Sequence, residues 1–368
     1  MQNGRVTTIP LDPTGTPGPF DLGALGAGLV FADSLGQLAA ALRADGPAGT
    51  AVVQAPPGTG KTTLVPPLVA NLLSGGSPRE AGQAGGKVPR TVVTQPRRVA
   101  ARAAARRLAA LDGSRLGDRV GYTVRGERKA GAGTLIEFVT PGILLRRLLS
   151  DPGLEGTGAV ILDEVHERGL ETDLLLGMLA EVRLLRGDLT LVAMSATLDA
   201  PRFAALLGEH DGGGPVPVVD CPSALHTLTV DWAPSALPRL DSRGVTRPFL
   251  DHVADTTAAA HFHALETDPG IDALVFLPGA REVSHVAARL RGRVKAEVLE
   301  LHGQAGPAEQ DRAVSGRDPG GPARIVVSTA LAESSLTVPG VRLVIDAGLS
   351  RELRRDANRG MSGLVTVS

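Results

Sequence analysis

Short apolar runs alternate with longer amphipathic stretches through the first half of the chain. The apolar runs predict β-strands at Thr50–Gln54, Thr91–Thr94, Leu135–Thr140, Ala159–Asp163 and Leu189–Ser195. Helical spacing of apolar residues predicts helices at Leu22–Leu42, Val99–Leu111 and Gly142–Leu149. Strands that alternate with helices usually pair in parallel and are covered on both faces, so this pattern predicts an α/β fold.

A similar series follows a break rich in Gly and Pro at Glu209–Pro222. Its predicted strands are Ala273–Leu277, Ala296–Leu301, Ala323–Ser328 and Arg342–Asp346, and its predicted helices are His252–Leu265 and Ala280–Leu290. We therefore expect two lobes, at residues 21–208 and 223–368, joined by a linker at 209–222. Residues 1–20 predict a disordered tail, and Ser74–Arg90 predicts a flexible surface insertion.

The composition limits the functions that this chain can have. Aromatic residues make up only 2% of the 368 residues, which disfavours base stacking as the main nucleic-acid contact. The net charge is -1, so bulk positive charge does not attract a polyanion. The single cysteine, Cys221, excludes a disulfide framework. Together with the absence of a signal-peptide pattern and of a long apolar run, this predicts a cytoplasmic protein.

A phosphate-binding loop is predicted between the first strand and a helix. The segment Ala55–Thr63 reads Ala-Pro-Pro-Gly-Thr-Gly-Lys-Thr-Thr. Glycines let backbone N–H groups turn toward phosphate oxygens, and the helix presents its positive end to them. Lys61 is then placed for the β- and γ-phosphates of ATP and Thr62 for Mg²⁺, and the predicted ATP-binding residues are Gly58, Thr59, Gly60, Lys61, Thr62 and Thr63. The alternative is an accidental Gly-rich turn that opens a helix.

An acidic box follows the predicted strand at Ala159–Asp163. The sequence there is Asp163-Glu164-Val165-His166, and adjacent carboxylates at the end of a buried strand are costly unless a cation compensates them. We expect Asp163 and Glu164 to lie at the Mg²⁺ site and Glu164 to activate the attacking water. The alternative is a strand end followed by a charged, solvated helix start.

Six motifs in the same order resemble those of the DEAH-box helicases of superfamily 2. They are the acidic box itself and the segments Thr94–Ala101, Thr140–Gly142, Ser195–Thr197, Phe276–Gly279 and Ser328–Gly340. Three further segments, Leu22–Phe31, Gly121–Arg125 and Leu349–Arg355, are similar to the HrpB-type branch. The resemblance implies two RecA-like P-loop lobes and an ATP-dependent RNA helicase that uses Mg²⁺.

The resemblance also implies roles for individual residues. Arg97, Thr140 and Gly142 in the first lobe, and Thr329 and Ser334 in the second, would contact the backbone of a single strand of nucleic acid, expected to be RNA. Ser195 and Thr197 would couple hydrolysis to movement of the lobes, and His166 would connect the acidic box to the second lobe. The alternatives are ordinary structural ones: a solvated helix start for Arg97, a turn residue for Thr140, and helix capping by Ser195 and Thr197.

The sequence departs from the family pattern in two places. Pro339 stands where splicing-type members have Asp, and the chain ends before the Gln-and-two-Arg motif that the resemblance places after the last segment. We therefore expect an incomplete second lobe with an exposed sheet edge. Three hypotheses stay open. The first is an active helicase core, and the second is a catalytically impaired fragment that binds ATP and RNA without the arginine fingers. The third is a P-loop ATPase that acts on another substrate. His261, His263, His302 and Cys221 are expected to be structural.

Overall fold

The chain is described here from a computed structural model. The structure describes residues 18–44, 49–75, 88–197, 199–209, 214–221, 227–318, 320–330, 338–356 and 361–368. The chain divides into two compact units, with the boundary between Leu225 and His226. Each unit is considered by itself.

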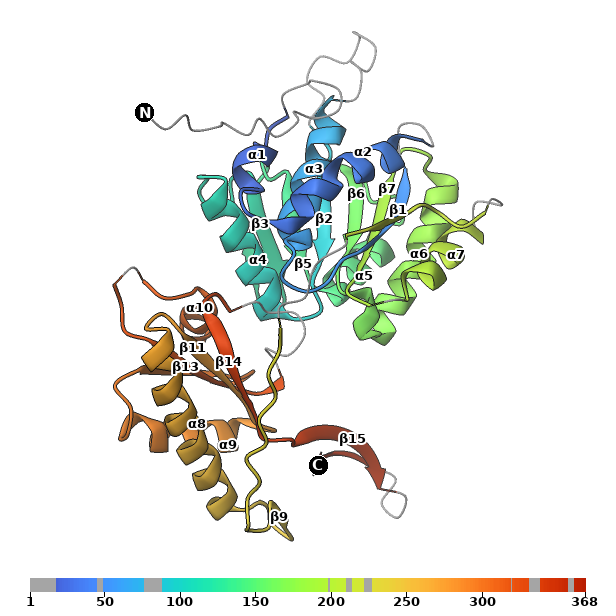
Figure 1. Cartoon of the computed structure of the whole chain (residues 1–368). Coiled ribbons are helices and arrows are strands. Elements are labelled where there is room, and N and C mark those ends of the chain that lie inside the picture. The colour runs from blue at the N-terminus through green and yellow to red at the C-terminus, as the bar shows by residue number, and fades with distance from the viewer. Residues whose placement is uncertain are drawn as a thin grey trace, which may run out of the picture. The chain divides into compact units, whose positions relative to one another are not determined.

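The first unit is built on an eight-stranded sheet in the order β4-β3-β5-β2-β6-β7-β1-β8 (Figure 1). Its strands are β1 (Thr50–Gln54), β2 (Arg90–Thr94), β3 (Val120–Val124), β4 (Glu127–Lys129), β5 (Ile136–Val139), β6 (Thr157–Leu162), β7 (Thr190–Ser195) and β8 (Val218–Asp220). Every neighbouring pair is parallel except β3 and β4. The carboxyl ends of seven strands therefore meet at one edge, where ligands of open α/β sheets usually bind.

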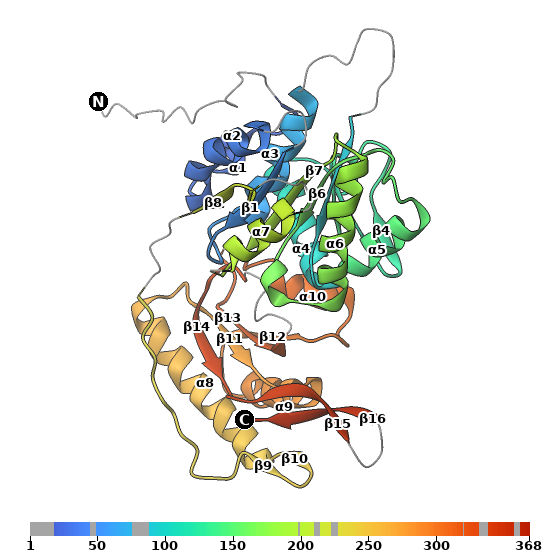
Figure 2. The ribbon, with the colours of Figure 1, turned by 90° about the vertical axis from the view of Figure 1, so that its right-hand side faces the viewer.

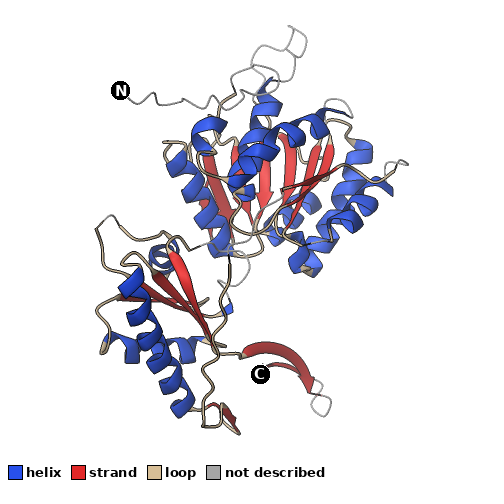
Figure 3. Ribbon diagram, in the orientation of Figure 1, coloured by secondary structure: helices blue, strands red, loops and turns tan. Residues whose placement is uncertain are grey.

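Helices cover both faces of this sheet (Figure 3). They are α1 (Leu22–Leu25), α2 (Leu35–Ala44), α3 (Lys61–Gly75), α4 (Arg98–Leu111), α5 (Pro141–Ser150), α6 (Leu170–Leu185) and α7 (Ala200–Glu209), with short 3-10 helices at Val30–Ser34 and Val165–Glu167. One core contains Val53, Val93 and Ile161 with side chains of α1 to α4, and the other contains Val52, Val92 and Val160 with side chains of α5 to α7. Successive residues of a strand point to opposite faces, which is why the central strands read as continuous apolar runs.

The edges of this unit differ from the sequence expectations. The predicted helix Leu22–Leu42 is broken into α1, a 3-10 helix and α2. Residues 1–17 of the predicted tail lie outside the described residues, but Phe20 is buried in the core, and the Asn71 side chain bonds its backbone N–H and C=O. Most of the predicted insertion, residues 76–87, also lies outside the described part of the chain.

Part of the predicted linker belongs to the first sheet. Val218–Asp220 forms β8 and pairs in parallel with β1, and the next residue, Cys221, is buried in the same core. Cys221 N–H donates to the carbonyl oxygen of Gln54 at 2.8 Å, which continues this pairing. The apolar pair Val218-Val219 explains the strand, because only a short run is needed at a sheet edge.

The second unit contains a parallel sheet in the order β12-β13-β11-β14 (Figure 2). The strands are β11 (Asp272–Phe276), β12 (Glu297–Leu301), β13 (Arg324–Ser328) and β14 (Val341–Asp346), and the helices are α8 (Arg247–Thr267), α9 (Ala280–Arg291) and α10 (Pro307–Val314). Side chains of α8 and α9 pack on one face of the sheet. The two parallel sheets and their flanking helices confirm the predicted α/β class.

Two antiparallel hairpins complete the description of the second unit. They are formed by β9 (Leu240–Asp241) with β10 (Gly244–Val245), and by β15 (Ser350–Asp356) with β16 (Met361–Val367). Strand β14 pairs with β11 on one side and, among the described residues, has no strand on the other. Also within the described residues, no helix is both long enough and apolar enough to cross a membrane.

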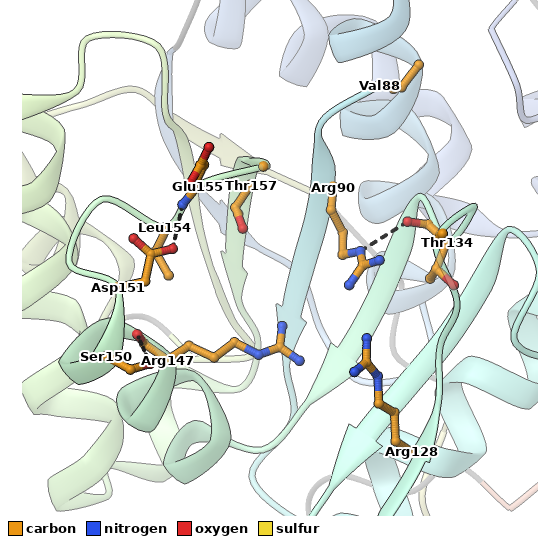
Figure 4. Close-up of a pocket in the computed structure, with 12 residues that line it drawn as sticks. Val88, Arg90, Arg128, Thr134, Arg147, Ser150, Asp151, Leu154, Glu155 and Thr157 are labelled. Atoms are coloured by element: carbon orange, nitrogen blue, oxygen red, sulfur yellow. Dashed lines mark hydrogen bonds between the residues drawn. The ribbon is translucent and has the colours of Figure 1, made fainter. Parts of the chain in front are cut away.

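A fully buried carboxylate lies near the amino edge of the first sheet. Glu137 accepts bonds from Arg90 at 2.7 Å, from Arg147 at 2.6 and 3.0 Å, and from Thr123 at 2.5 Å. Arg90 and Arg147 also line a cavity of about 390 Å³ together with Arg128 (Figure 4). Burial by itself raises the pKa of Glu137, but the bonds and charges of Arg147, Thr123 and Arg90 lower it to about 2.

We predict that this cluster makes the first unit sensitive to acid. Because the pKa of Glu137 falls from 4.5 to about 2 on folding, its contribution is present above pH 4.5 and is lost as the pH falls toward 2. That contribution is on the order of 3 kcal/mol. Glu137→Gln should lower the free energy of unfolding at neutral pH and flatten its dependence on pH in this range.

Urea unfolding at several pH values, followed through the single tyrosine Tyr122 on the neighbouring strand β3, measures this effect. Glu155→Gln, which changes an exposed carboxylate beside the same cavity, is the matched control. Equal acid sensitivity of the Glu137 variant and the unchanged chain would contradict the assignment.

Candidate nucleotide site and nucleic-acid contacts

The predicted phosphate loop connects β1 to α3 at the carboxyl edge of the first sheet. Gly58 and Gly60 have φ of +79° and +97°, a backbone conformation that glycine adopts without strain. Within the described residues, the N–H groups of Gly58, Thr59 and Gly60 donate to no protein acceptor. The loop therefore holds a set of free donors at the amino end of α3, as a phosphate cradle requires.

The N-terminal segment supports this loop from outside. Phe31 N–H donates to the carbonyl oxygen of Thr59 at 3.0 Å, and the Thr59 hydroxyl donates to the carbonyl oxygen of Pro56 at 2.9 Å. The side chain of Leu29 packs so closely that a Cβ on Gly60 would lie 2.8 Å from its Cδ1. Leu29 and Phe31 belong to the segment Leu22–Phe31, one of the three segments that are similar to the HrpB-type branch.

Asp163 follows β6 directly and accepts three hydrogen bonds. Its Oδ2 accepts from the Thr62 hydroxyl at 2.6 Å and from the Gln95 amide at 2.6 Å, and its Oδ1 accepts from the Glu164 N–H at 2.9 Å. Burial raises the pKa of Asp163, while the charge of Lys61 and the bond from Thr62 oppose that rise. Two of the three residues expected at the Mg²⁺ site, Thr62 and Asp163, are thus in direct contact.

Glu164 pairs with the lysine of the phosphate loop. Lys61 Nζ lies 3.0 Å from Glu164 Oε1, and both side chains are more than nine-tenths buried. Burial and the neighbouring Asp163 raise the pKa of Glu164 to about 7, against the effect of Lys61. Its other oxygen, Oε2, is buried and has no hydrogen-bond partner. Glu164 also has a φ of +55°, which is strained for this residue type.

His166 connects the acidic box to Ser195–Thr197 within the first unit. Ala196 N–H donates to His166 Nδ1 at 3.2 Å, so the neutral ring carries its proton on Nε2, which lies 3.3 Å from Glu164 Oε2. Burial and the charge of Lys61 lower the pKa of His166. Thr197 N–H donates to the Ser195 hydroxyl at 3.2 Å, and the two hydroxyl oxygens lie 3.4 Å apart. This chain of contacts joins Glu164 to the segment expected to couple hydrolysis to movement.

The donor set fits ATP with Mg²⁺. A protein cage of three or more His, Cys, Asp or Glu residues is absent from the described residues. Mg²⁺ usually takes one or two protein oxygens, with waters and phosphates completing its octahedron. Thr62 and Asp163 offer those protein oxygens, and the free N–H groups of the loop together with Lys61 suit phosphate. The unbonded Oε2 of Glu164 leaves an acceptor for a water.

The residues expected to contact a strand leave the same edge of the sheet. Arg97 precedes α4 and Thr140 precedes α5, and their strands β2 and β5 are neighbours. Arg97 Nη2 lies 3.6 Å from Glu167 Oε2, and the Thr140 side chain makes no capping bond. A Cβ on Gly142 would lie 3.0 Å from the end of the Glu171 side chain, which is exposed and can move aside, so the position does not require glycine.

In the second unit, only one of the two expected strand contacts can be described. Thr329 follows β13, and its N–H donates to the carbonyl oxygen of Leu301 at 3.1 Å. Ser334 lies outside the described residues. Among the histidines expected to be structural, His261 is buried with its ring 3.2 Å from the carbonyl oxygen of Ile271, and His263 is exposed on the same helix.

Comparisons with known proteins agree with this geometry. The profile of the DEAD/DEAH box helicase family matches residues 37–204, and that of the helicase conserved C-terminal domain matches residues 243–360. Together they cover most of the chain, with the phosphate loop and the acidic box inside the first match. The chain belongs to the DEAD/DEAH box helicase family.

Individual members of this family are similar over most of the chain. It is 36% identical to the ATP-dependent RNA helicase HrpB of Escherichia coli over 319 residues, which is 86% of this chain and 35% of that protein. It is 33% identical to the probable ATP-dependent RNA helicase DHX35 homolog of Caenorhabditis elegans, over 87% of this chain and 42% of that protein. This chain therefore spans less than half the length of these two helicases.

Solved helicase structures match the fold. A crystal structure of E. coli DEAH/RHA helicase HrpB superposes with a TM-score of 0.72 at 35% identity, covering 92% of this chain and 39% of that one. A crystal structure of E. coli DExH-box NTPase HrpB gives a TM-score of 0.63 at 36% identity, covering 92% and 38%. The predicted DEAH-box, HrpB-type family and its RecA-like lobes are confirmed.

We predict that Lys61 and Glu164 are strongly coupled in their effect on the free energy of unfolding when no ligand is bound. Lys61→Met leaves a buried carboxylate without its cation, and Glu164→Gln leaves a buried ammonium without its anion, so each should lower the free energy of unfolding. The double variant removes both charges, so its loss of unfolding free energy should be smaller than the sum of the losses in the two single variants. A double-mutant cycle from denaturant unfolding at pH 8 should give an interaction energy of roughly 1–3 kcal/mol. Additive losses would show that the two groups do not pair.

Proposed function

We propose that this chain is the motor core of an ATP-dependent RNA helicase. One observation carries the proposal. The buried side chains of Lys61, Asp163 and Glu164 and the half-buried Thr62 lie in two contacting pairs on adjacent residues, beneath a loop of free N–H donors. Family membership and the names of the two helicase relatives support the choice of RNA as the partner. The proposed substrate is ATP with Mg²⁺, and the proposed partner is single-stranded RNA.

Each residue of the cluster has a proposed task. The free N–H groups of Gly58, Thr59 and Gly60 hold the phosphates of ATP at the start of the helix that carries Thr62 and Thr63. Lys61 exchanges its partner Glu164 for a phosphate, and Thr62 and Asp163 hold Mg²⁺. In Mg²⁺–ATP bound here, water would attack the γ-phosphorus, and the bond between the γ-phosphorus and the β-phosphate oxygen would break to release ADP and phosphate. Glu164, once released by Lys61, accepts the proton of that water. Its buried Oε2, which has no hydrogen-bond partner, is suited to this role.

A second group of residues, His166, Ser195 and Thr197, is proposed to transmit the state of the bound nucleotide away from Glu164. His166 contacts Glu164 on one side and the backbone of Ala196 on the other, so a change at Glu164 can reach Ser195 and Thr197. We assign coupling to these two residues. Contact with the RNA backbone is assigned to Arg97, Thr140 and Gly142 in the first unit, and to Thr329 and Ser334 in the second. Backbone contacts of this kind carry little sequence preference.

ATP hydrolysis by the purified chain tests the first part. We expect turnover in Mg²⁺ that rises when single-stranded RNA is added, and loss of at least a hundredfold in Glu164→Gln, on the order expected when general-base catalysis is removed. The variant keeps the shape of the side chain and should still bind Mg²⁺–ATP, which equilibrium binding measures. Binding without turnover by the unchanged chain would instead support the impaired fragment. A chain that binds no nucleotide would refute the proposal.

RNA binding tests the second part. Arg97→Ala should weaken binding of a single strand at low salt and reduce the slope of log K against log salt by about one. Arg115→Ala removes an exposed guanidinium from the loop between α4 and β3 and is the matched control. Fluorescence anisotropy with a labelled oligoribonucleotide at several salt concentrations measures both. Equal slopes for the two variants would remove Arg97 from the contact.

A further inference from the structure

A buried amide that no predicted role uses holds the candidate metal carboxylate in place. Gln95 follows β2, is only 2% exposed, and donates from Nε2 to Asp163 Oδ2 at 2.6 Å. Its backbone N–H donates to the carbonyl oxygen of Val139 at 2.8 Å, which continues the pairing of β2 with β5. The backbone of Gln95 is therefore held by strand β5, and its side chain bonds Asp163, the residue that follows strand β6.

The sheet register makes this contact specific. Strand β2 also pairs with β6, and the last partners are Thr94 and Leu162. Gln95 and Asp163 each come one residue later, so they are opposite each other where the two strands end. A long amide at this position spans the gap between neighbouring strands, which lie about 4.8 Å apart.

The acceptor sites on Asp163 explain what the amide does. Its two oxygens accept from Gln95, Thr62 and the Glu164 N–H. An ionised carboxylate has about four acceptor sites, so these donors fix the plane of the group and leave one site open. Donors of this kind, which orient a ligand without touching the metal, typically contribute 10–100-fold to metal affinity or activity.

The same short segment also reaches the expected strand contact. Pro96 separates Gln95 from Arg97 and restricts the backbone on both sides of itself. Arg97 lies 3.6 Å from Glu167, which belongs to the 3-10 turn directly after the acidic box. The segment 95–97 therefore contacts the acidic box at Asp163 and also contacts Glu167, the residue that follows the box.

We propose that Gln95 is a positioning residue that orients the metal-binding carboxylate of Asp163 and connects it to the strand-contacting turn at Arg97. The inference rests on the proposed function of the same site. A phosphate that binds Arg97 and a cation that binds Asp163 both act on the segment 95–97, so RNA and Mg²⁺–nucleotide alter each other's affinity through it.

Equilibrium binding tests this proposal without relying on turnover. Gln95→Met keeps the length of the side chain and removes its donors. Binding of ADP is measured by calorimetry with Mg²⁺ and with EDTA, and binding of a labelled single-stranded RNA is measured with and without Mg²⁺–ADP. Gln54→Met is the matched control, because Gln54 also ends a strand at this edge and donates to an aspartate, Asp220, at 3.3 Å.

The expected result is selective. Gln95→Met should weaken ADP binding about tenfold or more in Mg²⁺ and leave it unchanged in EDTA, whereas Gln54→Met should alter neither. RNA affinity without nucleotide should stay the same, and its change on adding Mg²⁺–ADP should shrink toward zero.

Other outcomes overturn the inference. Equal weakening in Mg²⁺ and EDTA, or a matching loss of thermal stability and RNA affinity, would make Gln95 a structural residue only. Unchanged binding in every condition would remove it from the site. If the unchanged chain bound no Mg²⁺–ADP, the proposed function would fail first and this inference with it, so the two failures are distinguishable.

Discussion

Two adjacent carboxylates, buried at the end of a parallel strand, are the constraint around which the first unit is organised. Asp163 and Glu164 are 3% and 8% exposed, and only one cation, Lys61, pairs with them in the described part of the chain. Thr62 and Gln95 donate hydrogen bonds to Asp163, but these uncharged donors do not neutralise the excess negative charge. Burial raises the pKa of both acids, the charge of Asp163 raises that of Glu164 further, and Lys61 opposes both shifts. A divalent cation and the free N–H donors of the loop are the complementary charges that this arrangement accommodates.

Strain and packing hold the cluster in a conformation that the local sequence does not favour. Glu164 and Arg168 both have positive φ, at 55° and 46°, in the short turn that follows β6. Such conformations cost on the order of 1–3 kcal/mol each and persist where the surroundings determine them. Here the surroundings are the Lys61 pair, the His166 contact with Ala196, and the ion pair of Arg168 with Asp173. The turn aims Glu164 back into the site instead of along the strand direction.

The sequence predicted those parts of the structure that depend on local patterns. The central strands, α4 and α5 were found because their apolar periodicity is strong, and the phosphate loop and acidic box because their residue types have few other uses together. Strands β3 and β8 are short and weakly apolar, and their pairing depends on neighbours distant in the chain. The burial of Phe20 and Cys221 has the same origin. The bond from Gln95 to Asp163 could not be predicted either, because it requires the register between β2 and β6.

Completeness of pairing separates the buried charges that stabilise this fold from those that serve a site. Glu137 receives four bonds from two arginines and a threonine, and its pKa falls to about 2. In the second unit, Arg324 and Asp272 are similarly complete, since Arg324 also donates to backbone carbonyls and its own N–H bonds the aspartate. Glu164 follows strand β6 at the carboxyl edge of the same sheet, and it has one oxygen unbonded and a pKa raised to about 7. A folded core gains nothing from leaving such a group partly paired, because the cost of desolvation is not offset. The unbonded oxygen of Glu164 is an acceptor that a ligand could use, as the proposed function requires.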